Sequence, residues 1–339
     1  MVRNRTLSGV VAGIFMLACG SPDAESADGP SVGLLTSGPV SDAGWHAGAY
    51  EGLQLIGESL GFRISHQQTR STAELDEAFL SYAEAGYDLV FGHGFEFQDA
   101  ATRAGAAFPE VTFVVSAGSR PSANVIPLIF QLEEASYLAG MAAGGVTTSG
   151  TIGMVGGQAI PSAKGTFLAF EAGVKAVNPE ATVLETFTGS WEDVSAAKEA
   201  AAAQLRRGAD VLIHNVDAAS FGLFQSVREA RAQGRNVWAL GMNGNQNDVA
   251  PDVILGSAAI DMPKIFLQVA RDWQNDALGE GARYTGLAGG AVDFIPNPEL
   301  TGVLSPELLA RIGEARSGIM HGTLEIPRIR FVEDEPASP

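Results

Sequence analysis

Short apolar runs alternate with helix-length amphipathic segments from Ser31 onward. In the first half of the chain this alternation predicts strands over 31–35, 63–67, 88–92, 112–116 and 125–130, and helices over 44–60, 73–84 and 96–108. The run Thr112-Phe-Val-Val is apolar on both faces. Strands of that kind are typical of a parallel sheet covered by helices on both sides.

A second series of the same kind begins near Thr151. It predicts strands over 151–155, 182–187, 211–214, 237–240 and 253–258, with helices over 162–177, 194–207 and 220–233. A helix over 262–277 and a last helix over 306–321 follow. Repeated βα units of this length imply right-handed crossovers, so the fold class predicted is α/β, with two lobes that each contain a doubly wound parallel sheet.

Four glycines stand between a predicted helix and the next strand, where a left-handed residue ends the helix. They are Gly61, Gly86, Gly208 and Gly234. The segments Gly86-Tyr-Asp-Leu-Val and Gly208-Ala-Asp-Val-Leu are near-copies at equivalent places in the two series. We interpret them as one element that is used once in each lobe.

The N-terminus has the layout of a signal peptide. Arg3 and Arg5 precede Leu7–Leu17, which carries no charge and is short for a membrane span. Cys19 is the only cysteine in the chain. This arrangement resembles a bacterial lipobox, although Met16 replaces its usual leucine. We predict a signal peptide over 1–18 and lipidation of Cys19, with an ordinary secretory signal as the alternative.

Residues 19–30 are small and polar, so we expect the lipidated cysteine to be followed by a flexible tether. Acylation of the single cysteine would leave none for a disulfide. Gly20 in place of aspartate favours the outer membrane where the cell has one. The last residues, 333–339, are expected to fray.

The chain carries a formal charge of −18, which becomes −20 when the two arginines of the signal peptide are removed. Such an acidic surface repels nucleic acid, which is therefore excluded as a partner. The length of 339 residues, with 46% hydrophobic residues, favours two globular domains.

Catalytic and metal-binding templates are scarce. The five histidines form no His-x-x-x-His pair, and there is neither a Gly-x-Ser-x-Gly elbow nor a phosphate-binding P-loop. Gly153-Met-Val-Gly-Gly157 does not have the spacing of a dinucleotide site. We therefore predict no catalytic residue, no metal and no cofactor.

Ligands of open α/β sheets bind beyond the carboxyl ends of the strands. Aromatic, carboxylate and amide side chains recur at those positions in both series. The candidates are Asp42, Trp45, Phe95, Asp99, Trp191, His214, Asp217, Asn243 and Asp261. Stacking faces together with fixed hydrogen-bonding groups favour a planar, hydroxyl-bearing ligand such as a nucleoside.

Each candidate has a structural alternative. Asp42 and Asp99 lie near helix starts, where a carboxylate caps the helix or interacts with its dipole. Trp45 and Trp191 equally suit the cover of a lobe core. For His214, at the end of a strand, a hydrogen-bonded core position is the favoured alternative. Asn243 and Asn245 also suit turns.

Several motifs together resemble one known family. They include Gly38-x-x-x-Asp42-x-x-Trp45, Gly94-Phe95-x-Phe97-x-Asp99, the block Phe170-Glu-Ala-Gly-Val-Lys-Ala-Val-Asn-Pro179 and Thr188-Gly-Ser-Trp191-x-Asp193. With them the mature chain resembles the basic membrane protein family of ABC-transporter solute-binding lipoproteins, which includes purine-nucleoside receptors.

The resemblance implies a periplasmic-binding-protein type I fold, in which three strands form a hinge between the lobes. We expect lobe 1 to comprise 31–130 and 256–285, and lobe 2 to comprise 131–255 and 286–332. It further implies that Trp45 and Trp191 sandwich a base, that Asp42 and Asp99 hydrogen-bond the ligand, and that the partner is an ABC permease. The ligand would bind between the lobes by closure of the hinge.

Two positions depart from the family's pattern. Asn243 stands where a carboxylate that holds ribose is expected, and Ile260-Asp261 replaces a lysine on the last hinge strand. These departures bear on ligand specificity. The two rival functions are a ligand-sensing lipoprotein without a transport role and a nucleoside-processing enzyme that uses Asp42 or Asp99 as a base.

Overall fold

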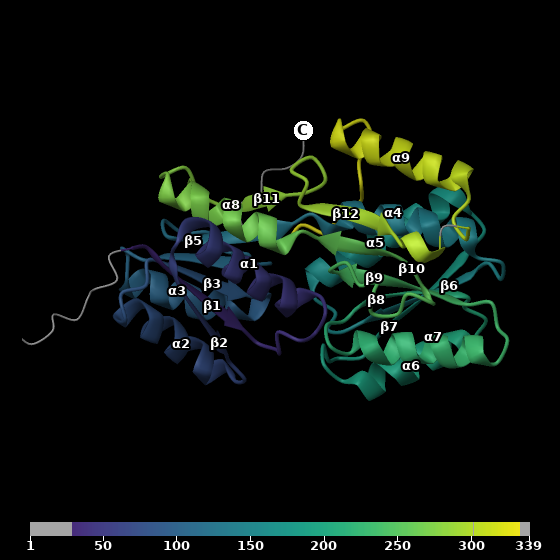
Figure 1. The fold of residues 1–339 in the computed structure, drawn as a ribbon, viewed down its shortest axis with the longest axis horizontal. Helices are drawn as coiled ribbons and strands as arrows, with labels where there is room; N and C mark the ends of the chain where they lie inside the picture. Colours follow the sequence, from purple (N-terminus) through teal and green to yellow (C-terminus); the bar gives the residue numbers. More distant parts are fainter. Residues whose placement is uncertain (1–28, 301, 333–339) are drawn as a thin grey trace, which may run out of the picture.

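Two six-stranded sheets form the centres of two lobes that lie side by side (Figure 1). The computed structural model describes residues 29–300 and 302–332. The predicted signal peptide, Cys19, most of the predicted tether and the tail 333–339 lie outside these residues. Within the described ranges, each helix is too short or too polar to cross a membrane.

The two sheets have the same strand order. The first runs β11 (Arg283–Thr285), β5 (Val125–Phe130), β4 (Thr112–Ser116), β3 (Leu89–His93), β1 (Ser31–Thr36), β2 (Arg63–Gln68). The second runs β12 (Val292–Pro296), β10 (Ile254–Ile260), β9 (Trp238–Asn243), β8 (Val211–Asn215), β6 (Thr151–Gly156), β7 (Thr182–Phe187). Paired strands are parallel in the first sheet, and in the second only β12 runs antiparallel to its neighbour. The predicted fold class is confirmed.

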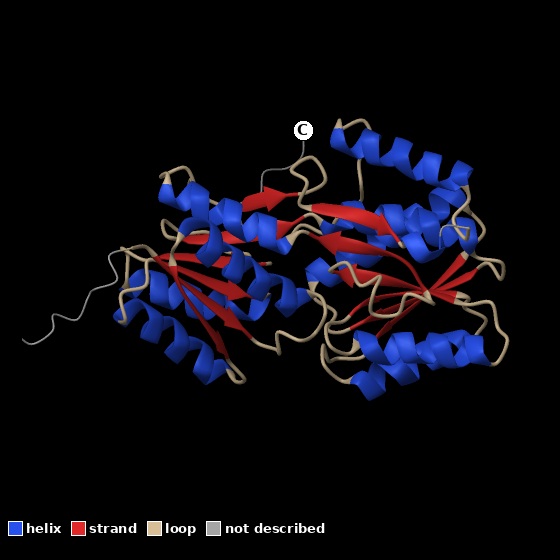
Figure 2. Ribbon diagram, viewed as in Figure 1, coloured by secondary structure: helices blue, strands red, loops and turns tan. Residues whose placement is uncertain are grey.

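Helices cover both faces of each sheet (Figure 2). On the first sheet they are α1 (Trp45–Leu60) and α8 (Met262–Gln274) on one face, and α2 (Thr72–Glu84) and α3 (Gln98–Ala107) on the other. Alternate side chains of β1 divide between the two faces: Leu34 packs with α1 and α8, whereas Leu35 packs with α2 and α3. Leu34 pairs in register with His66 of β2 and Phe91 of β3.

The second sheet is covered in the same way. Its helices are α4 (Leu132–Val146) and α5 (Pro161–Val177) on one face, and α6 (Val194–Arg206) and α7 (Ser220–Ala232) on the other. Helix α9 (Pro306–Met320) packs outside α4, and two short 3-10 helices, η1 (Phe95–Phe97) and η2 (Pro298–Leu300), follow β3 and β12.

Helices α4 and α5 approach each other closely because glycines face the contact. A Cβ atom on Gly140 would lie 2.1 Å from the carbonyl oxygen of Phe170, and one on Gly173 would lie 2.0 Å from that of Tyr137. Both distances are shorter than any tolerated contact, so the packing of these helices requires glycine at both positions.

The chain passes between the sheets three times: after β5, after β10 and between β11 and β12. These passages agree with the three-strand hinge of the predicted fold. β10 pairs with β9 and β12 along most of its length, up to Ile260. We therefore propose that residues 256–260 belong to the second lobe, rather than to the first as expected from sequence.

The repeated Gly-x-Asp element has the same role in both lobes. All four predicted capping glycines are left-handed, with φ between 70° at Gly61 and 98° at Gly208. Asp88 accepts hydrogen bonds from the backbone N–H and the hydroxyl of Ser31, both at 2.8 Å. Asp210 likewise accepts from the turn before β6, including the N–H of Thr148 at 2.7 Å. Each aspartate thus ties the start of one central strand to its neighbour.

Candidate functional site

The central strands of the two sheets end toward the space between the lobes. In each sheet the strand order reverses direction between the first and third strands, β1 and β3 or β6 and β8. Such a switch point opens a crevice at the carboxyl ends of the strands. Ser37, Glu96 and Asp217 follow β1, β3 and β8, and Asn215 is the last residue of β8. All four line one cavity there.

This cavity, which we call the aromatic cavity, encloses about 740 Å³ including its opening to solvent. Its lining combines aromatic and aliphatic side chains with a few polar groups. Among the lining residues are Trp45, Phe95, Glu96, Phe130, Glu133, Ile160, Thr166, Trp191, Asn215, Asp217, Asn243 and Phe331. Both lobes therefore contribute to one site.

Two tryptophans, one from each lobe, line the aromatic cavity. Trp45 begins α1 and stacks on His93, with ring centroids 4.1 Å apart, and meets Phe130 edge to face at 6.0 Å. Trp191 follows β7 and lies against Gly157, where a Cβ atom would come within 2.2 Å of its ring. Both rings are held by neighbours and only partly buried. They can therefore offer aromatic surface to a ligand.

A second cavity adjoins the first and shares Ser37, Phe95, Glu96, Trp191 and Asp217 with it. We call it the acidic cavity because Glu96, Glu192 and Asp217 line it together with His46. Burial raises the pKa of Glu96, and the hydroxyl of Ser37 partly opposes that shift. Polar binding groups are thus concentrated at this end of the site.

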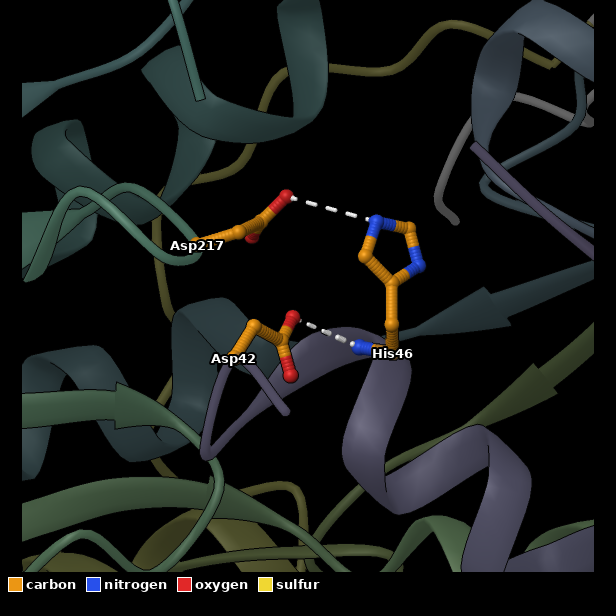
Figure 3. A group of neighbouring side chains, drawn as sticks. All are labelled: Asp42, His46 and Asp217. Carbon is orange, nitrogen blue, oxygen red and sulfur yellow. Dashed lines mark hydrogen bonds and ion pairs between the residues drawn. The ribbon is translucent and has the colours of Figure 1, made fainter. Parts of the chain in front are cut away.

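Asp217 and His46 face each other across the lobes (Figure 3). Asp217 Oδ2 lies 4.0 Å from His46 Nε2. Burial lowers the pKa of His46 to about 4 despite the attraction of Asp42, so the imidazole is neutral at neutral pH. Burial raises the pKa of Asp217, and the negative charges of Asp42, Glu96 and Glu192 raise it further.

The carboxylate of Asp42 caps the start of α1. It accepts backbone N–H groups from Gly44 at 3.1 Å, His46 at 2.8 Å and Ala47 at 2.9 Å. The side chain is fully buried and does not line either cavity. Of the two roles weighed from sequence, the structure displays the helix cap.

Asp42, His46 and Asp217 also form a candidate metal-binding group. One ligand atom from each lies within 4.8 Å of the others. Both oxygens of Asp42 already accept backbone N–H groups, however, so only His46 and Asp217 direct unshared atoms into the space between them. Two such ligands are fewer than a dedicated metal site uses.

Asn243 ends β9 in a left-handed conformation, with φ of 70°, which asparagine tolerates better than most residues. Its Nδ2 atom donates to Asp217 Oδ1 at 3.4 Å, and the residue lines the aromatic cavity. Asn243 therefore both shapes the turn and reaches the site, and it orients the carboxylate at the centre of the acidic cavity.

Four predicted site residues do not line the cavities. Asp99 is 66% exposed on α3 and pairs with Arg120. Asp261 is an exposed cap of α8 and accepts from the N–H of Lys264. Asp42 caps α1, as described above. His214 is buried, where its Nε2 atom lies 2.7 Å from Gln246 Oε1, and burial lowers its pKa to about 4.

The other five predicted residues, Trp45, Phe95, Trp191, Asp217 and Asn243, meet at the aromatic cavity. Sequence reasoning missed several further lining residues. Glu96, Phe130, Glu133 and Asn215 line the aromatic cavity, and His46 lines the acidic cavity. The signal for His46, Glu96 and Asn215 was adjacency, since each stands next to or near a predicted residue in a strand-end loop. Glu133 gave no such signal, because it follows a hinge passage at the start of α4.

A family model described as "ABC transporter substrate-binding protein PnrA-like" matches residues 30–330. The chain belongs to this family of ABC-transporter substrate-binding proteins. A basic membrane protein of Borrelia garinii subsp. bavariensis is 24% identical over 93% of both chains. The predicted family is therefore confirmed.

Two further relatives extend the comparison. A putative ABC transporter glucose-binding protein of Haloferax volcanii is 28% identical over 76% of this chain and 68% of its own. The crystal structure of an ABC transporter solute-binding protein from Aeropyrum pernix has a TM-score of 0.78 at 19% identity, covering 90% of this chain and 94% of that one. The Aeropyrum pernix structure thus shares the fold of this chain.

Proposed function

We propose that this substrate-binding protein is a membrane-anchored receptor that captures a nucleoside-like ligand between its lobes and delivers it to an ABC permease. The ligand bridges the two lobes, and the closed form gains population because only that form makes both sets of contacts. The protein acts outside the cytoplasm, held to the membrane by a lipid on Cys19. The protein binds and releases its ligand without changing it chemically.

The observation that carries the proposal is the pair of tryptophans in one cavity. Trp45 and Trp191 come from different lobes and line the same space. Asn215, Asp217 and Asn243 add acceptors and donors suited to ribose hydroxyls and base edges. Planar bases stack favourably on such rings, which fits a nucleoside better than an acyclic solute.

A hexose is the second candidate. Its support is the Haloferax volcanii relative, which is named as a putative glucose-binding protein. Aromatic rings and carboxylates also suit the apolar face and the hydroxyls of a sugar. Glucose therefore belongs beside the nucleosides in any ligand screen.

The enzymatic alternative is weaker than the receptor. An enzyme that used Asp42 or Asp99 as a base would need that carboxylate at the ligand, whereas Asp42 caps α1 and Asp99 is exposed on α3. A receptor that only senses its ligand would use the same cavity. Co-purification of a permease with the protein would separate transport from sensing.

A thermal-shift screen tests the ligand class. The mature chain is melted with nucleosides, free bases, pentoses and hexoses, each in excess. A ligand at a hundredfold excess over its Kd stabilises the native state by about 2.7 kcal/mol. A shift with nucleosides alone supports the proposal, and a shift with hexoses alone replaces the nucleoside by a sugar. Chromatography of the incubated ligand reports any turnover.

Membrane fractionation tests the anchor. The full-length protein is expected in the membrane fraction, from which detergent releases it. Cys19→Ser is expected to leave the membrane fraction without detergent once its signal peptide has been removed, and the mass of the variant shows whether removal has occurred. Equal membrane association of the wild type and of a Cys19→Ser protein that lacks the signal peptide would exclude the lipid anchor.

A further inference from the structure

The charged side chains of the acidic cavity all have the same sign. Glu96, Glu192 and Asp217 line it, and no lysine or arginine is among the described residues that line either cavity. Its one other titratable group is His46, whose pKa of about 4 leaves it neutral at neutral pH. The site therefore concentrates negative charge without a positive group of its own.

These carboxylates come from both sides of the space between the lobes. Glu96 follows β3 of the first sheet, whereas Glu192 and Asp217 follow β7 and β8 of the second. Like charges that face each other across an interface oppose its closure. Asp42 adds to the field, but its charge is offset by three backbone N–H groups. The carboxylates of the acidic cavity thus carry an electrostatic cost that a positive ligand would remove.

His46 provides independent support for a ligand at this end. Its side chain is only 3% exposed, yet Nδ1 has no hydrogen-bond partner among the described residues, and Nε2 has only Asp217 at 4.0 Å. Figure 3 shows the Nε2 edge of the ring turned toward the carboxylate of Asp217. Nε2 faces Asp217 at a distance too long for a hydrogen bond, so it is positioned to bond a group that enters between them.

The aromatic walls favour the same kind of ligand. Trp191 lines both cavities, and Trp45 and Phe130 line the aromatic cavity. The face of a tryptophan ring attracts a cation, and the attraction strengthens when water is excluded. A planar ring that carries positive charge would therefore gain from the tryptophans and from the carboxylates at once.

We infer that the ligand is an organic cation whose planar ring lies against Trp45 and Trp191, with its positive charge next to Asp217 and Glu96. This inference rests on the proposed function, because it assigns a charge to the ligand of the same site. The cation offsets repulsion between carboxylates of the two lobes, so it binds the closed form better than the open form. Closure is then coupled to the ligand's charge.

Isomeric nucleosides of different charge test the inference. At neutral pH, 1-methyladenosine and 3-methylcytidine are cations, whereas their isomers N6-methyladenosine and 5-methylcytidine are neutral. Titration calorimetry of the mature chain measures Kd for all four, in buffer containing EDTA. We expect at least one cation to bind roughly tenfold or more tightly than its neutral isomer, the gain typical of one charge-assisted contact.

Two variants locate the effect. Asp217→Asn keeps the shape of the side chain and is expected to remove most of the preference for the cation. Asp99→Asn, which removes an exposed carboxylate outside the cavities, is the matched control and should leave the preference unchanged. Glu96→Gln replaces Asp217→Asn if the latter does not fold. Equal or tighter binding of the neutral isomers would overturn the inference and leave the nucleoside proposal standing.

A ligand pair without ribose separates the two proposals. If none of the four nucleosides binds, the nucleoside proposal fails, and 1-methylnicotinamide is compared with neutral nicotinamide. Binding of the charged member alone, weakened by Asp217→Asn, would support a cation site for another ligand class. Failure of both members would overturn the inference as well. If a ligand binds only when Zn²⁺ replaces EDTA in the buffer, the site takes a metal ion, and the inference of an organic cation is overturned.

Discussion

Asp217 Oδ2 lies 4.0 Å from His46 Nε2, although the two residues belong to different lobes. His46 is in the first turn of α1, and Asp217 follows the central strand β8 of the second sheet. Because His46 is neutral at neutral pH, this contact is not an ion pair that holds the lobes together. Instead, it places an acceptor and a neutral imidazole where a ligand can connect them.

Removal of the Asp217 charge is expected to stabilise the ligand-free protein. Burial and the neighbouring carboxylates raise the pKa of Asp217, so its ionised form is disfavoured in the fold. Because the folded pKa lies above the unfolded pKa, this cost is present above the folded pKa and disappears as pH falls. Asp217→Asn should therefore raise the melting temperature at neutral pH, with Asp99→Asn as control. A lower melting temperature would show that Asp217 contributes to stability.

Asp42 is predicted to act on stability through α1. Its buried carboxylate accepts three N–H groups, whereas Asp193, an exposed cap of α6, accepts one from Ala196. Asp42→Ala should lose about 2–3 kcal/mol of unfolding free energy, and the matched Asp193→Ala about 1 kcal/mol. Urea denaturation measures both. Similar losses in the two variants would contradict the cap role described here.

The buried His214 gives a prediction for acid. Burial lowers its pKa from 6.5 to about 4, so the folded protein favours the neutral form of the His214 side chain. Its contribution to stability is complete above the unfolded pKa and is lost as pH falls from about 6.5 toward 4. His214→Gln should therefore reduce the loss of stability between neutral pH and pH about 5, by roughly 1–2 kcal/mol. Urea denaturation at both pH values checks this, and parallel pH curves would contradict it.

The glycines between α4 and α5 are expected to be intolerant of a methyl group. An added Cβ at Gly140 would lie 2.1 Å from a backbone oxygen that cannot move aside. Gly140→Ala should cost about 3 kcal/mol or more. Gly313, on the exposed side of α9, meets nothing within 4 Å, so Gly313→Ala should instead gain about 0.5–1 kcal/mol. If the denaturation midpoints of Gly140→Ala and Gly313→Ala shift in the same direction by the same amount, the close contact between α4 and α5 is not the cause.

Much of the fold was predictable because periodicity reports burial. Runs such as Thr112-Phe-Val-Val showed strands covered on both faces, and four glycines marked the helix ends correctly. β11 and β12 were not predicted as strands. β11 has only three residues, Arg283–Thr285, and β12 alternates without a strongly apolar run. Their pairing depends on contacts with β5 and β10, which are distant in sequence.

The site was predictable only in part. Trp45, Trp191 and Asp217 all lie in strand-end loops and line one cavity, since topology brings the carboxyl ends of parallel strands together. Topology alone does not determine which way each side chain points. Asp99, on α3, is exposed to solvent, whereas Glu96, three residues earlier, lines the cavity. Such differences depend on local turns, here the 3-10 helix Phe95–Phe97.

The nucleoside site between the lobes is tested most directly by calorimetry. The Kd of the nucleoside that binds wild type most tightly is measured for wild type, Trp45→Ala and Trp191→Ala. Trp273→Phe is the control, because Trp273 donates to Thr112 outside the cavities. We predict that each alanine variant weakens binding by about tenfold or more, while the control binds like wild type. Unchanged affinity in both alanine variants, or no nucleoside binding to wild type, would contradict a nucleoside site between the lobes.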